Sequence, residues 1–308
     1  MIDYFKTSDD NSLITIEKAQ AGCWISVVEP TEEEIHMLIN DFGLDKGFVK
    51  SSLDDEENSR VEIEDDQTLI IVDTPFAETQ SENTILYYTM PMGIVITESY
   101  VFTISVKENS IITDLASGVV RNLKTQQKTR FVLLLLLRIT ARFLQSLKQI
   151  DKISFAMEQQ LHGSMKNKEL IQLLGLEKSL VYFSTSLKSN DITLEKILRG
   201  RVIKLYEEDQ DLLEDVIIEL KQAIEMANIY SGILSGMMDA FASVISNNLN
   251  IVMWRLTIIT IIMAIPTMVF SFYGMNTSGL PVAATWFPTL ISVAATGAVA
   301  FFLLKKKK

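Results

Sequence analysis

The stretch LTIITIIMAIPTMVFSFY, residues 256–273, decides the fold of this chain. It carries no charge and is long enough to cross the hydrocarbon core of a bilayer as a helix. A second uncharged run, WFPTLISVAATGAVAFFLL, covers residues 286–304, and the loop between the two runs is uncharged as well. Buried core helices can share this composition, but two such runs joined by an uncharged loop favour a membrane hairpin.

The charges around these runs predict their orientation. Arg255 precedes the first run, Lys305 to Lys308 follow the second, and no Asp or Glu occurs after residue 250. Basic residues next to membrane spans are typical of the cytoplasmic side. We therefore expect a multi-pass protein of the cell membrane with both termini in the cytoplasm. The loop of residues 274–285 would then face outside.

Small and polar side chains recur along one side of the first predicted span. On the helical period they share a stripe about 100° wide, flanked by isoleucines. Such residues can join helices inside a membrane, or they can line a water-filled pore. The span by itself leaves both interpretations open. Pro266 predicts a kink in this helix. The stripe contains Asn250, Met253, Thr257, Thr260, Ala264, Thr267 and Ser271.

Composition limits what the rest of the chain does. A length of 308 residues suggests roughly two domains. The formal charge of −11 argues against nucleic acid as a partner. One cysteine and two histidines argue against a disulfide framework and a tetrahedral zinc site. Glycine loops for nucleotides and the common hydrolase motifs are missing from the sequence, so we expect neither an enzyme nor a nucleotide-binding protein.

The residues before the membrane part predict mixed strands and helices. Apolar, β-branched runs at 68–75, 83–90, 93–98 and 100–107 indicate strands. Thr31 followed by Glu34 predicts a capping box at the start of a helix. The leucine-rich run VLLLLL, residues 132–137, is too short to span a membrane and is followed by Arg138, so we assign it to a buried core.

We therefore predict an α+β membrane protein with an N-terminal α/β cytosolic domain, a long helical stalk and two C-terminal transmembrane helices. A stalk helix of about 100 Å would need neighbours along its length, which indicates an oligomer. The stalk helices are expected at 128–161, 167–188 and from about 205. The predicted parts are 1–125 (α/β domain), 126–204 (antiparallel stalk helices), 205–273 (stalk helix continuing into the first span at about 256), 274–285 (outer loop), 286–304 (second span) and 305–308 (basic tail).

Acidic residues gather at the start of the predicted long helix. Glu208, Asp211, Asp215 and Glu219 follow i, i+3 and i+4 spacing, so their carboxylates would share one face. A second acidic run covers residues 54–66. Such residues can form a solvated surface or, as oxygen ligands, a site for Mg²⁺ or Ca²⁺. Both interpretations stay open.

The motif Tyr-Gly-Met-Asn at 273–276 ends the first span, before a short outer loop and a terminal lysine cluster. At this position, and together with the features above, it resembles the CorA family of magnesium transporters. The stretches SGMMDAFASVISNNLNIVMWRLTIIT (235–260) and AIPTMVFSFYGMN (264–276) also resemble the family. The order of α/β domain, stalk and two spans extends the resemblance to nearly the whole chain.

The resemblance implies a homopentamer in the lipid bilayer, with one central pore lined by the first span of each chain. Gly274, Met275 and Asn276 would form the selectivity filter, with a ring of five Asn276 side chains at its outer end. The lower pore positions would be Asn250, Met253, Leu256 and Thr267.

The implied activity is passive, potential-driven uptake of Mg²⁺, with Co²⁺ and Ni²⁺ as further candidate cargo. Intracellular Mg²⁺ bound to acidic cytosolic residues would gate the pore. Asp215 and Asp239 fall on the stalk positions that resemble the family's regulatory metal site. Asp211 and Glu208, from the acidic face described above, complete the set of candidate ligands.

One departure from the family leaves the transported ion open. Members commonly carry an acidic residue in the outer loop, within Met-Pro-Glu-Leu, whereas this loop reads TSGLPVAAT. A zinc transporter of the related ZntB type is therefore an alternative, although Met275 in the signature favours magnesium. A membrane-anchored metal sensor that does not conduct is a third interpretation. The polar stripe and the Gly-Met-Asn sequence argue against it, because an anchor needs neither.

Overall fold

The computed structural model describes residues 1–8, 10–81, 84–120, 122–160, 167–199, 202–275, 284 and 286–305. The chain forms two compact units, Met1–Gly236 and Met237–Lys308. Helix α6 (Gln210–Tyr273) contributes to both units. This division differs from the domain boundaries expected from the sequence, which stay a prediction.

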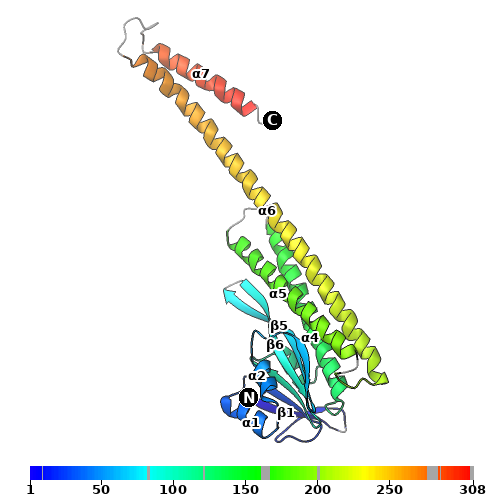
Figure 1. Ribbon diagram of the computed structural model, residues 1–308. Helices are drawn as coiled ribbons and strands as arrows, with labels where there is room; N and C mark the ends of the chain where they lie inside the picture. Colours follow the sequence, from blue (N-terminus) through cyan, green and yellow to red (C-terminus); the bar gives the residue numbers. More distant parts are fainter. Residues whose placement is uncertain are drawn as a thin grey trace. The chain divides into compact units, whose positions relative to one another are not determined.

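The first unit is built around a mixed β-sheet (Figure 1). Within the described residues the sheet has seven strands in the order β2-β1-β3-β7-β6-β5-β4. Strands β3 and β7 run parallel, and the other neighbours are antiparallel. The strands are β1 (Ile2–Thr7), β2 (Leu13–Ile16), β3 (Trp24–Val28), β4 (Arg60–Glu64), β5 (Gln67–Ser81), β6 (Thr84–Ile96) and β7 (Val101–Ser105).

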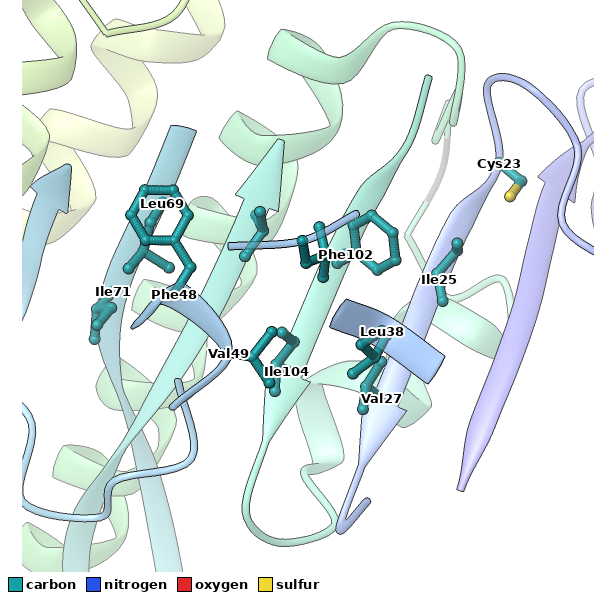
Figure 2. Packing of buried hydrophobic residues seen from close by; sticks show 12 residues of the cluster. Cys23, Ile25, Val27, Leu38, Phe48, Val49, Leu69, Ile71, Phe102 and Ile104 are labelled. Carbon is teal, nitrogen blue, oxygen red and sulfur yellow. The ribbon is translucent and has the colours of Figure 1, made fainter. Parts of the chain in front are cut away.

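Two short helices, α1 (Glu32–Asn40) and α2 (Lys46–Ser52), cover one face of the sheet. Figure 2 shows Leu38 of α1 and Phe48 of α2 over apolar side chains of the central strands. The capping box predicted at Thr31 is confirmed: the Glu34 N–H donates to the Thr31 hydroxyl, and the Thr31 N–H donates to the Glu34 carboxylate at 2.8 Å. This cap satisfies amide groups that the first turn of a helix leaves unpaired.

Helix α2 lies very close to strand β6 at Gly93. A Cβ atom added at Gly93 would come within 1.9 Å of the Ser52 Oγ. That hydroxyl cannot easily move, because it donates to the Phe48 carbonyl at 2.7 Å. Glycine is therefore required here by the close approach of two backbones, since any side chain would overlap α2.

Helices α3 (Ser110–Ala116), α4 (Lys128–Gln160) and α5 (Asn167–Leu198) belong to the opposite face of the sheet. Trp24 anchors α4 there: its ring lies 5.3 Å from that of Phe131, and its indole N–H donates to the Thr103 hydroxyl at 2.9 Å. The run 132–137 is mostly buried, which confirms its assignment to a core. Asp114 of α3 binds Arg138 and Arg142 of α4, at 2.6 and 2.5 Å.

Helix α5 provides hydrogen bonds where neighbouring strands end. Along β5, the pairing with β4 ends at Ile71, which lies opposite Arg60. Beyond Ile71 the Asn190 side chain accepts from the Asp73 N–H and donates to the Asp73 carbonyl, both at 2.9 Å. The Ser179 hydroxyl likewise accepts from the Tyr87 N–H at 3.1 Å. Backbone groups that would be buried without partners are thereby satisfied.

The strand prediction was wrong at one point. The sequence indicated separate strands at 83–90 and 93–98, whereas the structure has one continuous strand, β6. Pro91 cannot donate to a ladder, but β7 pairs with β6 only from Met92 onward. Proline is tolerated just beyond the end of a neighbouring strand, because no ladder bond is lost there. Helix α5 is also longer than expected, ending at Leu198 instead of about residue 188.

The second unit contains the C-terminal part of α6 and helix α7 (Trp286–Lys305). Both helices have segments long and apolar enough to cross a membrane. Helix α6 begins at Gln210, after a 3₁₀ turn at Glu207–Asp209, a few residues later than expected. An N-terminal mixed α/β unit, a long helix and a C-terminal helix thus confirm the predicted fold class.

Candidate ion pathway and acidic face

The face of α6 that meets α7 is apolar. The ring of Tyr273 lies 6.5 Å from that of Phe287 in α7, which identifies this face. Ile258 is buried on the same side, and further side chains there are partly buried. They repeat with the helical period, so they form one continuous stripe. This stripe contains Ile258, Ile262, Ile265, Pro266, Val269 and Tyr273.

The predicted pore-lining residues lie on the other side of α6. On the helical period, their stripe is roughly opposite the stripe that meets α7. All eight positions are exposed in the structure: Asn250, Met253, Leu256, Thr257, Thr260, Ala264, Thr267 and Ser271. A stripe of hydroxyl groups exposed on a helix that crosses a membrane suits water or another protein surface better than lipid, which offers no donor to their free lone pairs.

Three threonines of this stripe present oxygen lone pairs outward. The hydroxyls of Thr257, Thr260 and Thr267 donate to backbone carbonyls one turn earlier, at 2.8, 2.9 and 3.0 Å. A hydroxyl that has donated its proton still accepts hydrogen bonds. Water molecules around a cation point their hydrogens outward, so this row of acceptors suits a hydrated cation.

The same face of α6 is hollowed. A surface hollow of about 650 Å³ extends along it toward the C-terminal end of the helix. Hydroxyl and small side chains share its lining with methionine and phenylalanine side chains. The lining residues are Thr260, Met263, Ala264, Thr267, Met268, Ser271, Phe272 and Met275.

Part of the predicted filter follows the end of α6. The N–H of Gly274 donates to the Phe270 carbonyl at 2.9 Å, and Met275 is exposed. A Cβ atom at Gly274 would lie 3.1 Å from that carbonyl, so glycine relieves a tight approach here. Asn276, the predicted ring residue, lies outside the described residues, as does most of the outer loop.

The acidic face differs from its prediction at one end. Asp211 and Asp215 are exposed on α6, but Glu208 belongs to the preceding 3₁₀ turn. Its position therefore does not follow the α-helical spacing assumed from the sequence. Glu219, well before the apolar segment of α6, has a raised pKa because of burial and the nearby charge of Asp215. Asp215 and Glu219 thus repel each other.

Asp239 is an exposed residue of the second unit. Among the residues that the structure describes, no three acidic, histidine or cysteine side chains converge closely enough to hold a metal ion. The candidate ligands in the described part of a single chain therefore do not form a closed site.

Sequence reasoning missed one partly buried acid with a shifted pKa. Asp73 belongs to β5 and is covered by α5, and this burial raises the pKa of its carboxyl, although the nearby Ser186 and Ser59 hydroxyls act in the opposite direction. The only signal in the sequence is an acid inside the apolar run TLIIVDTP, residues 68–75. Nothing local predicts that helix α5 covers it.

Comparison with known proteins identifies relatives over nearly the whole chain. The family profile described as CorA-like Mg2+ transporter protein matches residues 19–306. A cobalt/magnesium transport protein CorA of Methanocaldococcus jannaschii is 30% identical over 264 residues, covering 84% of this chain and 81% of that protein. A protein of the same name from Thermotoga maritima is 24% identical over 326 residues, covering 99% and 88%.

The fold agrees with this relationship. The complete structure of the CorA magnesium transporter from Methanocaldococcus jannaschii matches with a TM-score of 0.80 at 25% identity. The match covers 99% of this chain and 96% of the solved one. With a family profile that covers most of the sheet unit and both candidate spans, the chain belongs to the family of CorA-like Mg2+ transporter proteins.

Proposed function

We propose that this chain forms a homopentamer in the cell membrane and takes up Mg²⁺ passively through a central pore. Membership in a family of transporters agrees with the expectation that the chain is not an enzyme. The observation that carries the proposal is the row of hydroxyls exposed on the α6 face opposite α7. Two relatives are named cobalt/magnesium transport proteins, so Co²⁺ is a second candidate cargo.

A ring of chains is supported by what flanks the hydroxyl stripe. Exposed apolar side chains run along both of its sides, with Ile259 and Phe270 on one and Ile261 and Phe272 on the other. In a ring, one such ridge packs against the other ridge of the next chain, and the stripe between them faces the axis. The second unit therefore has the surfaces needed for closed, head-to-tail packing.

We infer that Asn276 recognises Mg²⁺ through its water shell. Mg²⁺ sheds its water reluctantly, and a ring of carboxylates would hold it strongly. Amide oxygens accept hydrogen bonds from the bound waters without a full charge, which permits both recognition and release. An inside-negative membrane supplies about 2.3 kcal/mol per charge per 100 mV, doubled for a divalent ion, so uptake needs no nucleotide.

We further propose that intracellular Mg²⁺ gates the pore from the acidic face. The repulsion between Asp215 and Glu219 supports this proposal, because a divalent cation would relieve it. Asp211, Glu208 and Asp239 are the other proposed ligands, contributed by neighbouring chains of the pentamer. When Mg²⁺ leaves, repulsion between carboxylates would loosen the cytosolic assembly and open the pore.

Uptake into liposomes tests the function. The purified protein is reconstituted with a Mg²⁺-sensitive dye inside, and an inside-negative potential is applied with and without Asn276→Ala. The matched control is Asn248→Ala, which removes an exposed amide of α6 outside the hydroxyl stripe. We expect wild-type and control entry and no entry through Asn276→Ala.

Equal entry through Asn276→Ala would contradict the filter assignment. No Mg²⁺ entry through any variant, with inner Mg²⁺ chelated, would contradict the proposed cargo. The same vesicles are then tested with Zn²⁺ and Co²⁺. If none of the three ions enters, the sensor interpretation is favoured.

A further inference from the structure

Helix α6 contains a carbonyl group that has lost its regular partner. In an α-helix the carbonyl of residue 262 accepts from the N–H of residue 266, but residue 266 is a proline. Ile262 and Pro266 both belong to the apolar stripe that meets α7. In the membrane core such a carbonyl is satisfied by Ser or Thr side chains or by a neighbouring helix.

Helix α7 contains a hydroxyl group in the complementary situation. The Thr296 Oγ is buried and, among the residues that the structure describes, has no hydrogen-bond partner. The threonines of α6 behave differently: Thr257, Thr260 and Thr267 each donate to a carbonyl of their own helix. Thr296 makes no such bond, so its proton is available to another group.

Thr296 belongs to the face of α7 that packs on α6. The covered side chains of α7 repeat every three or four residues, so they form one stripe. That stripe contains Phe287, Pro288, Ile291, Ser292, Ala295, Thr296, Val299 and Ala300. The opposite side, with Trp286, Leu290, Val293 and Phe301, is exposed.

The two groups also lie at similar heights along the helix pair. The contact between Tyr273 and Phe287 sets the pairing of these antiparallel helices. Thr296 and Ala264 are equally far in sequence from this contact, Thr296 after Phe287 and Ala264 before Tyr273. They therefore lie at about the same height. A helical carbonyl points about two residues onward, so the oxygen of Ile262 lies near the height of Ala264.

We infer that the Thr296 hydroxyl donates a hydrogen bond to the Ile262 carbonyl when α6 bends at Pro266. A proline bend opens the side of the helix whose carbonyl has lost its partner, here the side facing α7. The segment beyond Pro266, which carries Thr267 and Ser271, then tilts toward the hydroxyl stripe. Thr296 is thus a positioning residue for the outer part of the ion pathway.

This inference deepens the proposed function, and its effect on ion flux rests on that function. The hydrogen bond itself does not depend on the proposed function, because it joins two helices of the same chain. It can therefore be tested by unfolding as well as by transport.

The test is a double-mutant cycle in the full-length protein. Thr296→Val removes the hydroxyl at nearly constant shape, and Pro266→Ala returns an N–H to the Ile262 carbonyl. We expect Thr296→Val to change the initial Mg²⁺ flux into liposomes by about three- to tenfold, the range for one hydrogen bond between membrane helices. It should also lower the thermal unfolding midpoint in detergent. In the Pro266→Ala background it should have no further effect on either measurement.

A further variant keeps the test decisive if Pro266→Ala does not fold. Thr296→Ser retains the hydroxyl and is expected to behave as wild type.

The inference is overturned if Thr296→Val acts equally in both backgrounds, or if Thr296→Ser is as impaired as Thr296→Val. If the wild type shows no flux, the proposed function fails, and the unfolding midpoints still decide whether the hydrogen bond exists.

Discussion

The sheet unit and the C-terminal helix pair use apolar residues in opposite ways. In the sheet unit, Phe102 is fully buried between the sheet and α1/α2, and its neighbours form one core. In the helix pair, Phe301 is 69% exposed. The hydroxyl residues on the far side of α6 are exposed as well. The first unit buries its apolar surface within the chain, whereas the second leaves apolar and polar stripes uncovered.

This difference identifies what the second unit needs. Exposed apolar residues on α7 suit lipid, because they have no polar groups to satisfy. The hydroxyl stripe of α6 suits water, and the apolar ridges beside it suit further copies of the same helix. A pore shared between chains meets all three requirements, while the sheet unit meets its own within the chain.

The largest expected difference comes from truncating one phenylalanine in each unit. Phe102→Ala should lower the free energy of unfolding by about 3–5 kcal/mol, because it leaves a cavity in a closed core. Phe301→Ala should leave the unfolding of the sheet unit unchanged and weaken only the partition of α7 into lipid. Denaturant unfolding in detergent, followed by circular dichroism, measures both. Equal losses of unfolding free energy in Phe102→Ala and Phe301→Ala would contradict the contrast between the two units.

A smaller loss is expected where the sheet and α2 approach most closely. Gly93→Ala places a methyl group against the Ser52 side chain and should lower the free energy of unfolding by about 3 kcal/mol. The matched control is Gly175→Ala in α5, where no atom lies within 4 Å of the added methyl. It should raise stability by up to about 1 kcal/mol. Adding Ser52→Gly to Gly93→Ala should recover part of the loss, and no recovery would place the clash elsewhere.

The third prediction concerns the partly buried carboxyl of Asp73. Burial raises its folded-state pKa above the unfolded value of about 3.9. At pH values between these two pKa values, the folded state binds more protons than the unfolded state. The free energy of unfolding therefore falls as the pH rises through this window. Asp73→Asn should flatten this part of the pH profile and raise the denaturant midpoint at pH 7, on the order of 1 kcal/mol. Ser59→Ala, which removes a nearby hydroxyl that lowers the pKa of Asp73, should make this part of the profile steeper.

The smallest effect on stability is expected in the hydroxyl stripe. Thr260→Val removes a hydroxyl whose one hydrogen bond among the described residues is to its own helix, so the unfolding free energy should change by less than about 0.5 kcal/mol. Mg²⁺ flux should nevertheless fall, because the pathway loses an acceptor. Ile259→Val, the neighbouring position outside the stripe, is the control. A large loss of stability with unchanged flux would indicate that the stripe joins helices and does not line a pore.

Local patterns in the sequence predicted the elements that depend on local physics. The capping box at Thr31 needs only two side chains within one turn. The core assignment of residues 132–137 depends on the length of an apolar run and its flanking Arg138. The two spans depend on length and missing charge, and the structure has long apolar helices at both places.

What local patterns could not predict depends on which surfaces meet. The partial burial of Asp73 requires α5, more than 90 residues later in the chain, to lie against β5 beyond its pairing with β4. The need for glycine at Gly93 arises from α2 lying against β6. The break expected before residue 93 was wrong because Pro91 sits just where β7 stops pairing. Each outcome is a long-range contact, and single-residue propensities carry no information about it.

The sequence by itself determined that α6 has a hydroxyl stripe with a proline near it, because the spacing of residues along a helix fixes which of them share a face. Only the tertiary structure decided that this stripe lies opposite α7 and that Pro266 and Thr296 belong to the faces that meet. Periodicity shows which side chains share a face of a helix. Packing against a second helix decides which face is covered and which is left for water, lipid or another chain.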